Sequence, residues 1–204
     1  SSETYNIEFV SANPTGPMHV GHCRGAIYGD VLANLLKFNG NKVTKEYYIN
    51  DYGNQIKYFV ESVYLRIREI KFDEKFSFKK NLYPGLYIKE IAKKILNKNK
   101  EKNFDEFDKI YQYLKVKSLE ESMLLIKNDL NQLGISHDNF FSETDLVNKD
   151  LVNQAVSKLK EKKFVEEGYL EPPKGEINEN WKKTKRLIFK STLFGDDSDR
   201  ALQK

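Results

Sequence analysis

The sequence has one cysteine in 204 residues, which excludes an internal disulfide and favours a reducing compartment. Long apolar runs are also missing, because no stretch reaches the roughly 18 residues that a membrane span needs. The first residues, SSETYNIEF, lack the basic segment and apolar core of a secretory signal. These absences predict a cytoplasmic protein that makes no use of a membrane.

A strong excess of one charge is missing too. The 34 lysines and arginines exceed the 30 aspartates and glutamates by only four, which permits contact with nucleic acid but does not demand it. The composition, with 39% hydrophobic and 31% charged residues, is typical of a soluble globular protein. The length suits one domain, or one domain with a large insertion.

Apolar spacing at the start of the chain alternates between the strand and helix periods. Residues 5–11 and 42–49 alternate as strands do, whereas residues 20–38 and the run from Ile56 to Ile67 have helical spacing. Strand, helix, strand and helix in this order build a parallel sheet through right-handed crossovers. The sequence therefore predicts an α/β fold with a Rossmann-like parallel sheet.

Lysine-rich helices are predicted across the middle of the chain. One opens at Pro84–Gly85, a longer one covers about residues 104–133, and a third covers about residues 145–163. From Lys71 onward, the stretch NFF at residues 139–141 is the first convincing strand. This region is typical of a helical insertion.

We expect three segments. Residues 1–70 form the first half of the sheet domain, residues 71–165 form the helical insertion, and residues 166–204 form short strands and turns.

The stretch SANPTGPMHVGH, residues 11–22, joins the first strand to the first helix. In an open parallel sheet, ligands lie beyond the carboxyl ends of the strands, and phosphates meet the amides of a helix N-terminus there. Gly16 and its proline neighbours favour a rigid turn, and Gly21 permits a close approach of another group. His19 and His22 lie three residues apart, so that both imidazoles can donate to one phosphate. The stretch suits a nucleotide site.

Other interpretations of the histidine pair remain open. His19 and His22 also fit a surface pair that caps the helix, or half of a zinc site. Cys23 points to a different face of the helix and no fourth ligand is near in sequence, so we expect no metal here.

Longer motifs carry a family resemblance. NIEFVSANPTGPMHVGHCRGAIYGDVLANLL, followed by VTKEYYINDYGNQI, resembles the first half of the catalytic domain of the arginyl-tRNA synthetases, which are class I aminoacyl-tRNA synthetases. HVGH corresponds to the HIGH motif of that class, with Val20 at its second position. YPGLYI, residues 83–88, and FKSTLFGDDSDRALQK at the end extend the resemblance over nearly the whole chain.

The resemblance implies an ATP site. His19, Gly21, His22 and Gly16 would line it, and the two histidines would contact the phosphates as catalytic residues. The arginine carboxylate would attack the α-phosphate of ATP while pyrophosphate leaves, and Mg²⁺ would accompany ATP.

The resemblance also implies an arginine site at Glu8, Ser11 and Asn13. Glu8 would lie near the guanidinium, and Ser11 and Asn13 near the α-amino and carboxylate groups. A carboxylate is the natural partner of a planar guanidinium. Without the resemblance, Glu8 also fits a solvated strand residue, and Asn13 fits an Asx turn before Pro14.

Residues after the second strand form a possible rim of this site. They could border the nucleotide or the tRNA 3′ end; they are Asp51, Gly53, Asn54 and Gln55. Alternatively, Asn50 or Asp51 caps the next helix.

Two features near the end of the sequence are less specific. The acidic run GDDSDR, residues 195–200, suggests Mg²⁺ or a solvated turn. Trp181 and its basic neighbours suggest contact with acceptor-stem RNA, or a buried aromatic beside a solvated basic turn; these neighbours are Lys182, Lys183, Lys185 and Arg186.

The family pattern continues beyond this sequence. Family members add a second half with a KMSKS-like loop, and the 204 residues contain no such pattern. We therefore expect a fragment, inactive alone and with an exposed sheet edge, of a monomeric enzyme that joins arginine to tRNA(Arg). A truncated protein that only binds a nucleotide or RNA is the alternative, and another nucleotidyltransferase of the same fold is a third.

Overall fold

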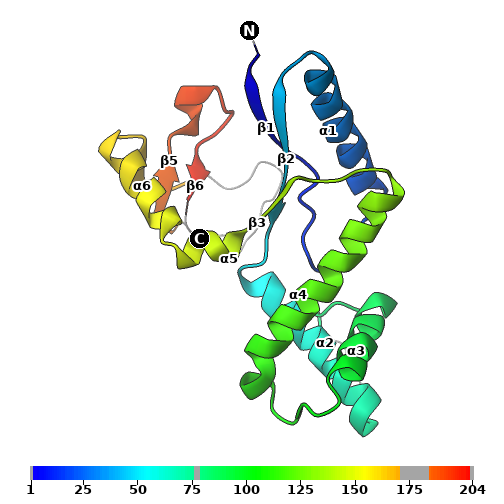
Figure 1. The fold of residues 1–204 in the computed structure, drawn as a ribbon. Coiled ribbons are helices and arrows are strands. Elements are labelled where there is room, and N and C mark those ends of the chain that lie inside the picture. Colours follow the sequence, from blue (N-terminus) through cyan, green and yellow to red (C-terminus); the bar gives the residue numbers. More distant parts are fainter. Residues whose placement is uncertain (1, 76–78, 171–183, 203–204) are drawn as a thin grey trace. The chain divides into compact units, whose positions relative to one another are not determined.

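A computed structural model describes residues 2–75, 79–170 and 184–202. The chain divides into two compact units, Ser1–Asp145 and Leu146–Lys204. Each unit is described by itself, with the elements labelled as in Figure 1. The boundaries that the sequence predicts between its three segments, near residues 70 and 165, stay predictions.

A three-stranded parallel sheet lies in the first unit. Its strands are β1 (Thr4–Glu8), β2 (Lys42–Ile49) and β3 (Asn139–Ser142), with β2 in the centre. Helix α1 (Val20–Phe38) connects β1 to β2, as expected for a parallel crossover. The α/β class and the parallel sheet are thus confirmed.

The first strand is shorter than predicted. It ends at Glu8, because Val10 and Ser11 have positive φ angles of 67° and 42° that turn the chain out of the strand. A β-branched residue at positive φ is rare and costs on the order of 1–3 kcal/mol, so tertiary contacts must hold this turn.

Three helices form a separate cluster in the first unit. They are α2 (Asn54–Phe72), α3 (Leu86–Lys98) and α4 (Phe107–Gln132). The buried face of α2 packs in one core with α3 and α4, within the connection from β2 to the parallel strand β3. Amphipathic spacing showed that α2 buries a face, but the partner of that face lies later in the chain.

Helix α4 joins this cluster to the sheet (Figure 1). Ile110 and Leu114, near its start, belong to the core of the helical cluster. Met123, Ile126 and Leu130, near its end, belong to the core beside Phe9 and Tyr47. One helix of 26 residues therefore contributes to two hydrophobic cores.

Helix α1 lies close to the sheet through small residues. Ala26, Gly29 and Ala33 are its buried positions. The larger side chains that gave the helical spacing are exposed instead, including Val31 at 50% and Leu35 at 56%. The apolar side of α1 therefore faces away from the sheet.

The second unit contains an antiparallel sheet of β4 (Val165–Gly168), β5 (Arg186–Phe189) and β6 (Arg200–Ala201). The prediction of a single helix over residues 145–163 is wrong. Asp150, with a φ of 58°, separates two helices in this range. They are α5 (Glu143–Asn148), which begins in the first unit, and α6 (Leu151–Glu161). A short 3₁₀ helix, η1 (Ser191–Phe194), precedes β6. In the described ranges, no helix is long and apolar enough to cross a membrane.

Candidate active site

The turn after β1 is fixed by hydrogen bonds to its neighbouring strand. The hydroxyl of Tyr47 donates to the carbonyl oxygen of Ala12 over 2.8 Å, and both residues are buried. The Oγ atom of Ser11 accepts the N–H of Tyr48 at 3.0 Å and donates to the carboxylate of Glu8. Glu8 and Ser11, two of the three predicted arginine-site residues, therefore lie in direct contact at the carboxyl end of β1.

The two histidines stack at the start of α1. Their ring centroids are 3.7 Å apart, with 21° between the ring planes. His19 is the N-cap residue, and its Nδ1 accepts the N–H of Gly21 at 3.1 Å. The Nδ1 atom of His22 accepts the N–H of His19 at 3.3 Å. This reciprocal cap satisfies two of the free amides of the first turn.

The cap assigns the tautomer of both rings. In a neutral imidazole, one nitrogen accepts and the other carries the hydrogen. Because both Nδ1 atoms accept backbone N–H groups, both Nε2 atoms carry the hydrogen and remain as donors. His19 and His22 thus keep one N–H donor each, on stacked rings at a helix N-terminus, where an anion is favoured.

Local electrostatics keep His22 neutral. Its partial burial, together with the neighbouring His19, lowers the pKa of His22 below its ordinary value. Gly21 permits the arrangement, because a β-carbon there would lie 3.0 Å from Cε1 of His19. The group that approaches Gly21 is therefore the imidazole of His19.

Asn13 connects the turn to the predicted rim. Its Oδ1 accepts from Nδ2 of Asn50 at 3.2 Å, and its Nδ2 donates to Oε1 of Gln55 at 3.4 Å. Gln55 thus lies beside Asn13, and both are exposed. Asn54 is the exposed first residue of α2, and no contact joins it to this group.

Asp51 has a different role. Its carboxylate accepts from Oγ of Ser142 at 2.6 Å and from the N–H of Thr144 at 2.8 Å, which holds the start of α5. The N-cap of α2 is Gly53, with φ 91° and no side-chain cap. The alternative that Asn50 or Asp51 caps α2 is therefore wrong.

The aspartates of the acidic run near the end of the chain have partners within the same segment. Arg200 pairs with Asp196 at 2.7 Å and with Asp197 at 2.9 Å, and the pairing holds the pKa of Asp196 well below its usual range. Asp199 accepts from the N–H and the hydroxyl of Thr192. Within the part of the chain that is described, no group of three or more His, Cys, Asp or Glu residues could hold a metal ion. These carboxylates do not fit a Mg²⁺ site.

The predicted RNA-contact residues fall mostly outside the structure. Trp181, Lys182 and Lys183 lie outside the described residues. Lys185 forms an exposed ion pair with Glu167 at 2.6 Å, and Nε of Arg186 donates to Thr184 at 3.0 Å; neither contact indicates a nucleic-acid surface.

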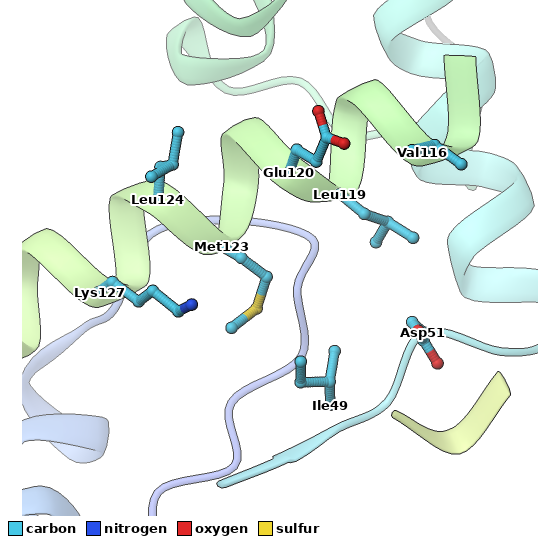
Figure 2. Close-up of a pocket in the computed structure, with 8 residues that line it drawn as sticks. All are labelled: Ile49, Asp51, Val116, Leu119, Glu120, Met123, Leu124 and Lys127. Carbon is cyan, nitrogen blue, oxygen red and sulfur yellow. The ribbon is translucent and has the colours of Figure 1, made fainter. Parts of the chain in front are cut away.

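A groove that the sequence did not predict lies between α4 and the end of β2. It has a volume of about 570 Å³, and Figure 2 shows Leu119 and Met123 pointing from α4 toward Ile49. Its other lining residues are Asp51, Val116, Glu120, Leu124 and Lys127. It contains none of the predicted ATP or arginine residues.

Comparisons with known proteins give a consistent result. Residues 2–169 match the family described as tRNA synthetases class I (R), catalytic domain. The chain is 58% identical over 203 residues to the arginine-tRNA ligase of Pelagibacter ubique (strain HTCC1062), which covers 99% of this chain and 35% of that protein. It is 49% identical over 204 residues to the arginine-tRNA ligase of Wolbachia pipientis wMel, covering 100% of this chain and 35% of that protein.

A solved structure agrees. The putative arginyl-tRNA synthetase from Campylobacter jejuni superposes with a TM-score of 0.79 at 32% identity, over 100% of this chain and 41% of that chain. The present chain thus spans about 35% of the length of the curated relatives it matches.

Proposed function

The chain belongs to the family of class I (R) tRNA synthetase catalytic domains, and we propose that it is part of an arginine-tRNA ligase. In this proposal, its residues bind ATP and arginine for the formation of arginyl-adenylate, and the whole enzyme transfers arginine to tRNA(Arg). The observation that carries the proposal is the stacked pair of His19 and His22, with both Nε2–H groups free to donate, at the carboxyl end of β1.

The histidines stabilise charge on the triphosphate. The arginine carboxylate attacks the α-phosphorus of ATP, a new P–O bond forms, and the bond to pyrophosphate breaks. Negative charge on the phosphate oxygens is then met by the Nε2–H groups of His19 and His22. Donors of this kind, fixed before the reaction, are worth on the order of 10²–10³ in rate each. Both donate through Nε2, because their Nδ1 atoms accept from backbone amides.

Arginine lies at the turn after β1. The exposed carboxylate of Glu8 is the partner for the guanidinium, and the hydroxyl of Ser11 orients that carboxylate. Asn13 and Gln55 form a connected pair of amides beside it, and we assign Asn13 to the α-amino or carboxylate group of arginine.

Further polypeptide completes the site. Within the described residues β1 is an edge strand, and α1 exposes apolar side chains such as Leu35 and Phe38. Both features support a second half of the catalytic domain that covers them. In this proposal the KMSKS-like loop lies in that second half. Because positioned groups on both sides of the substrates are needed, this chain alone is expected to be inactive. The whole enzyme is proposed to be a cytoplasmic monomer.

Titration of ATP and of arginine against the chain tests the assigned residues. We expect the double substitution His19→Ala with His22→Ala to weaken ATP binding and leave arginine binding unchanged. Equal ATP affinity before and after the change would remove the proposed role of the histidines. Arginine-dependent exchange of pyrophosphate into ATP by the full-length protein with tRNA(Arg) present, and none by the 204-residue chain under the same conditions, tests the reaction. Robust charging of tRNA by the chain alone would contradict the proposal.

A further inference from the structure

Two side chains from the helical cluster hold the histidine turn from outside. The hydroxyl of Tyr87 donates to the carbonyl oxygen of Thr15 over 2.8 Å, and the N–H of Met18 donates to Oδ2 of Asp129 over 3.2 Å. The partners are 72 and 111 residues apart in the sequence. These contacts join α3 and α4 to the segment that leads into His19.

The Tyr87 contact is built closely. Tyr87 lies in the first turn of α3, and its ring covers Gly16, where a β-carbon would lie 3.0 Å from the hydroxyl oxygen. Burial raises the pKa of Tyr87 to about 12, so the hydroxyl keeps its hydrogen at neutral pH. Thr15 is 8% exposed, so loss of the hydroxyl removes a partner from a carbonyl in a buried residue.

The Asp129 contact acts one residue before the cap. Met18 immediately precedes His19, whose backbone N–H and ring both take part in the cap of α1. Asp129 is half-buried on α4, close to the residues that α4 contributes to the sheet core. The backbone is thus fixed at Thr15 and again at Met18.

From this geometry we infer that Tyr87 and Asp129 are positioning residues, which hold the turn so that His19 caps α1 and both Nε2–H groups face the triphosphate. The inference rests on the proposed function. Both residues act through the backbone, because their hydrogen bonds go to the carbonyl oxygen of Thr15 and the N–H of Met18. A displacement of about 1 Å in such a site can cost about 100-fold in rate, so two anchors on a glycine- and proline-containing turn matter for catalysis.

Nuclear magnetic resonance of the 204-residue chain tests the geometry without any substrate. Long-range ¹H–¹⁵N spectra report which nitrogen of His19 and of His22 carries the hydrogen. We expect Nε2–H in the native chain and a mixture of tautomers in Tyr87→Phe and in Asp129→Leu. Asp129→Asn keeps an oxygen acceptor, so it should preserve the native pattern.

Tyr64→Phe is the matched control. The hydroxyl of Tyr64 also donates to a backbone carbonyl, that of Asp105 at 3.0 Å, within the same helical cluster but away from the turn. We expect it to lower the melting temperature about as much as Tyr87→Phe does and to leave both histidine tautomers native. Native tautomers in both Tyr87→Phe and Asp129→Leu would overturn the inference.

Pyrophosphate exchange by the full-length protein, with tRNA(Arg) present throughout, tests the consequence for catalysis. We expect Tyr87→Phe and Asp129→Leu to lower kcat about 10- to 100-fold with each KM within about twofold, and Asp129→Asn and Tyr64→Phe to keep the native kcat. A native kcat in both Tyr87→Phe and Asp129→Leu would overturn the inference. Absence of arginine-dependent exchange in the unsubstituted protein would instead overturn the proposed function, while the tautomer spectra still decide the positioning.

Discussion

The ring of Phe9 packs directly on the backbone of Gly29, so that a β-carbon on Gly29 would overlap the ring. This contact brings α1 against the end of β1 and helps to hold the turn that follows. Gly29 is buried, and Phe9 is 8% exposed. A glycine in the middle of a helix costs about 0.5–1 kcal/mol relative to alanine, and the close packing of Phe9 offsets that cost.

We therefore expect Gly29→Ala to lower the free energy of unfolding by about 1–3 kcal/mol, because the added carbon overpacks the contact with Phe9. Gly25, on the same helix, has no atom within 4 Å of the corresponding position. Gly25→Ala should raise the free energy of unfolding by about 0.5–1 kcal/mol. Urea denaturation measures the free energy of unfolding of both variants. Equal changes in the two would contradict the close packing of Phe9 on Gly29.

Lys45 is buried in an ion pair between the sheet and α1. Its ammonium lies 2.6 Å from Asp30 and 3.0 Å from Oδ1 of Asn34, and the residue is 8% exposed. Asp30→Ala should lower the free energy of unfolding by about 3 kcal/mol, because it leaves a buried cation without its counter-charge. Lys45→Met, which removes that cation, should cost less.

The exposed pair of Lys109 and Glu106 is the control for this prediction. Glu106→Ala should change the free energy of unfolding by less than about 0.5 kcal/mol. A loss in Asp30→Ala as small as that in Glu106→Ala would show that the buried pair contributes no more than a surface pair.

His137 makes the first unit sensitive to acid. Its ring lies 4.3 Å from the ring of Phe9 and 5.3 Å from that of Tyr47. Burial lowers the pKa of His137, and the positive charge of Lys45 acts in the same direction, against opposing contributions from the Phe9 backbone, Asp30 and Asp138. The unfolded chain therefore takes up its proton first as the pH falls.

The contribution of His137 to the free energy of unfolding should accordingly be fully present above the ordinary histidine pKa of about 6.5. It should decrease as the pH falls below that value. Urea midpoints measured between pH 8 and pH 5 test this, with His137→Phe as the comparison. The decrease should be smaller in His137→Phe, with a remainder from His22, whose pKa is also lowered. Parallel curves for the two proteins would contradict the assignment to His137.

The apolar side of α1 should make the isolated chain associate. Phe38 is 89% exposed and Leu35 is 56% exposed on this helix. We expect Leu35→Glu with Phe38→Glu to shift the chain toward monomer in sedimentation measurements. Leu86→Glu, at an 80% exposed position on α3, is the control and should leave the association unchanged. A native chain that stays monomeric at high concentration would contradict the prediction.

Local patterns predicted the elements whose limits are set by local signals. The bounds of α1 and β2 agree with the prediction, because a Pro/Gly turn precedes α1 and Gly40, with φ 86°, follows it. The end of β1 could not be predicted, since apolar alternation continues through Val10 while tertiary contacts turn the backbone there.

The grouping of the candidate site residues could be predicted only in part. Strand ends placed Asn13, Asp51 and Gln55 on one edge of the sheet, and Asn13 and Gln55 do lie together. Asp51 turns instead toward Ser142 and Thr144, which are 91 and 93 residues away in the sequence. Tyr87 lies in the stretch YPGLYI, but neither Tyr87 nor Asp129 carried a signal for contact with the turn, because only the folded arrangement brings them there.

Helix α4 has a consequence for how the first unit unfolds. Because its start and its end belong to different hydrophobic cores, melting of either core removes helical residues that the other core needs. The unit Ser1–Asp145 should therefore lose both cores in one cooperative transition, with equal calorimetric and van't Hoff enthalpies. The helical cluster then does not unfold independently of the sheet. A change in its packing also displaces the turn that leads into His19, because α3 and α4 hold that turn.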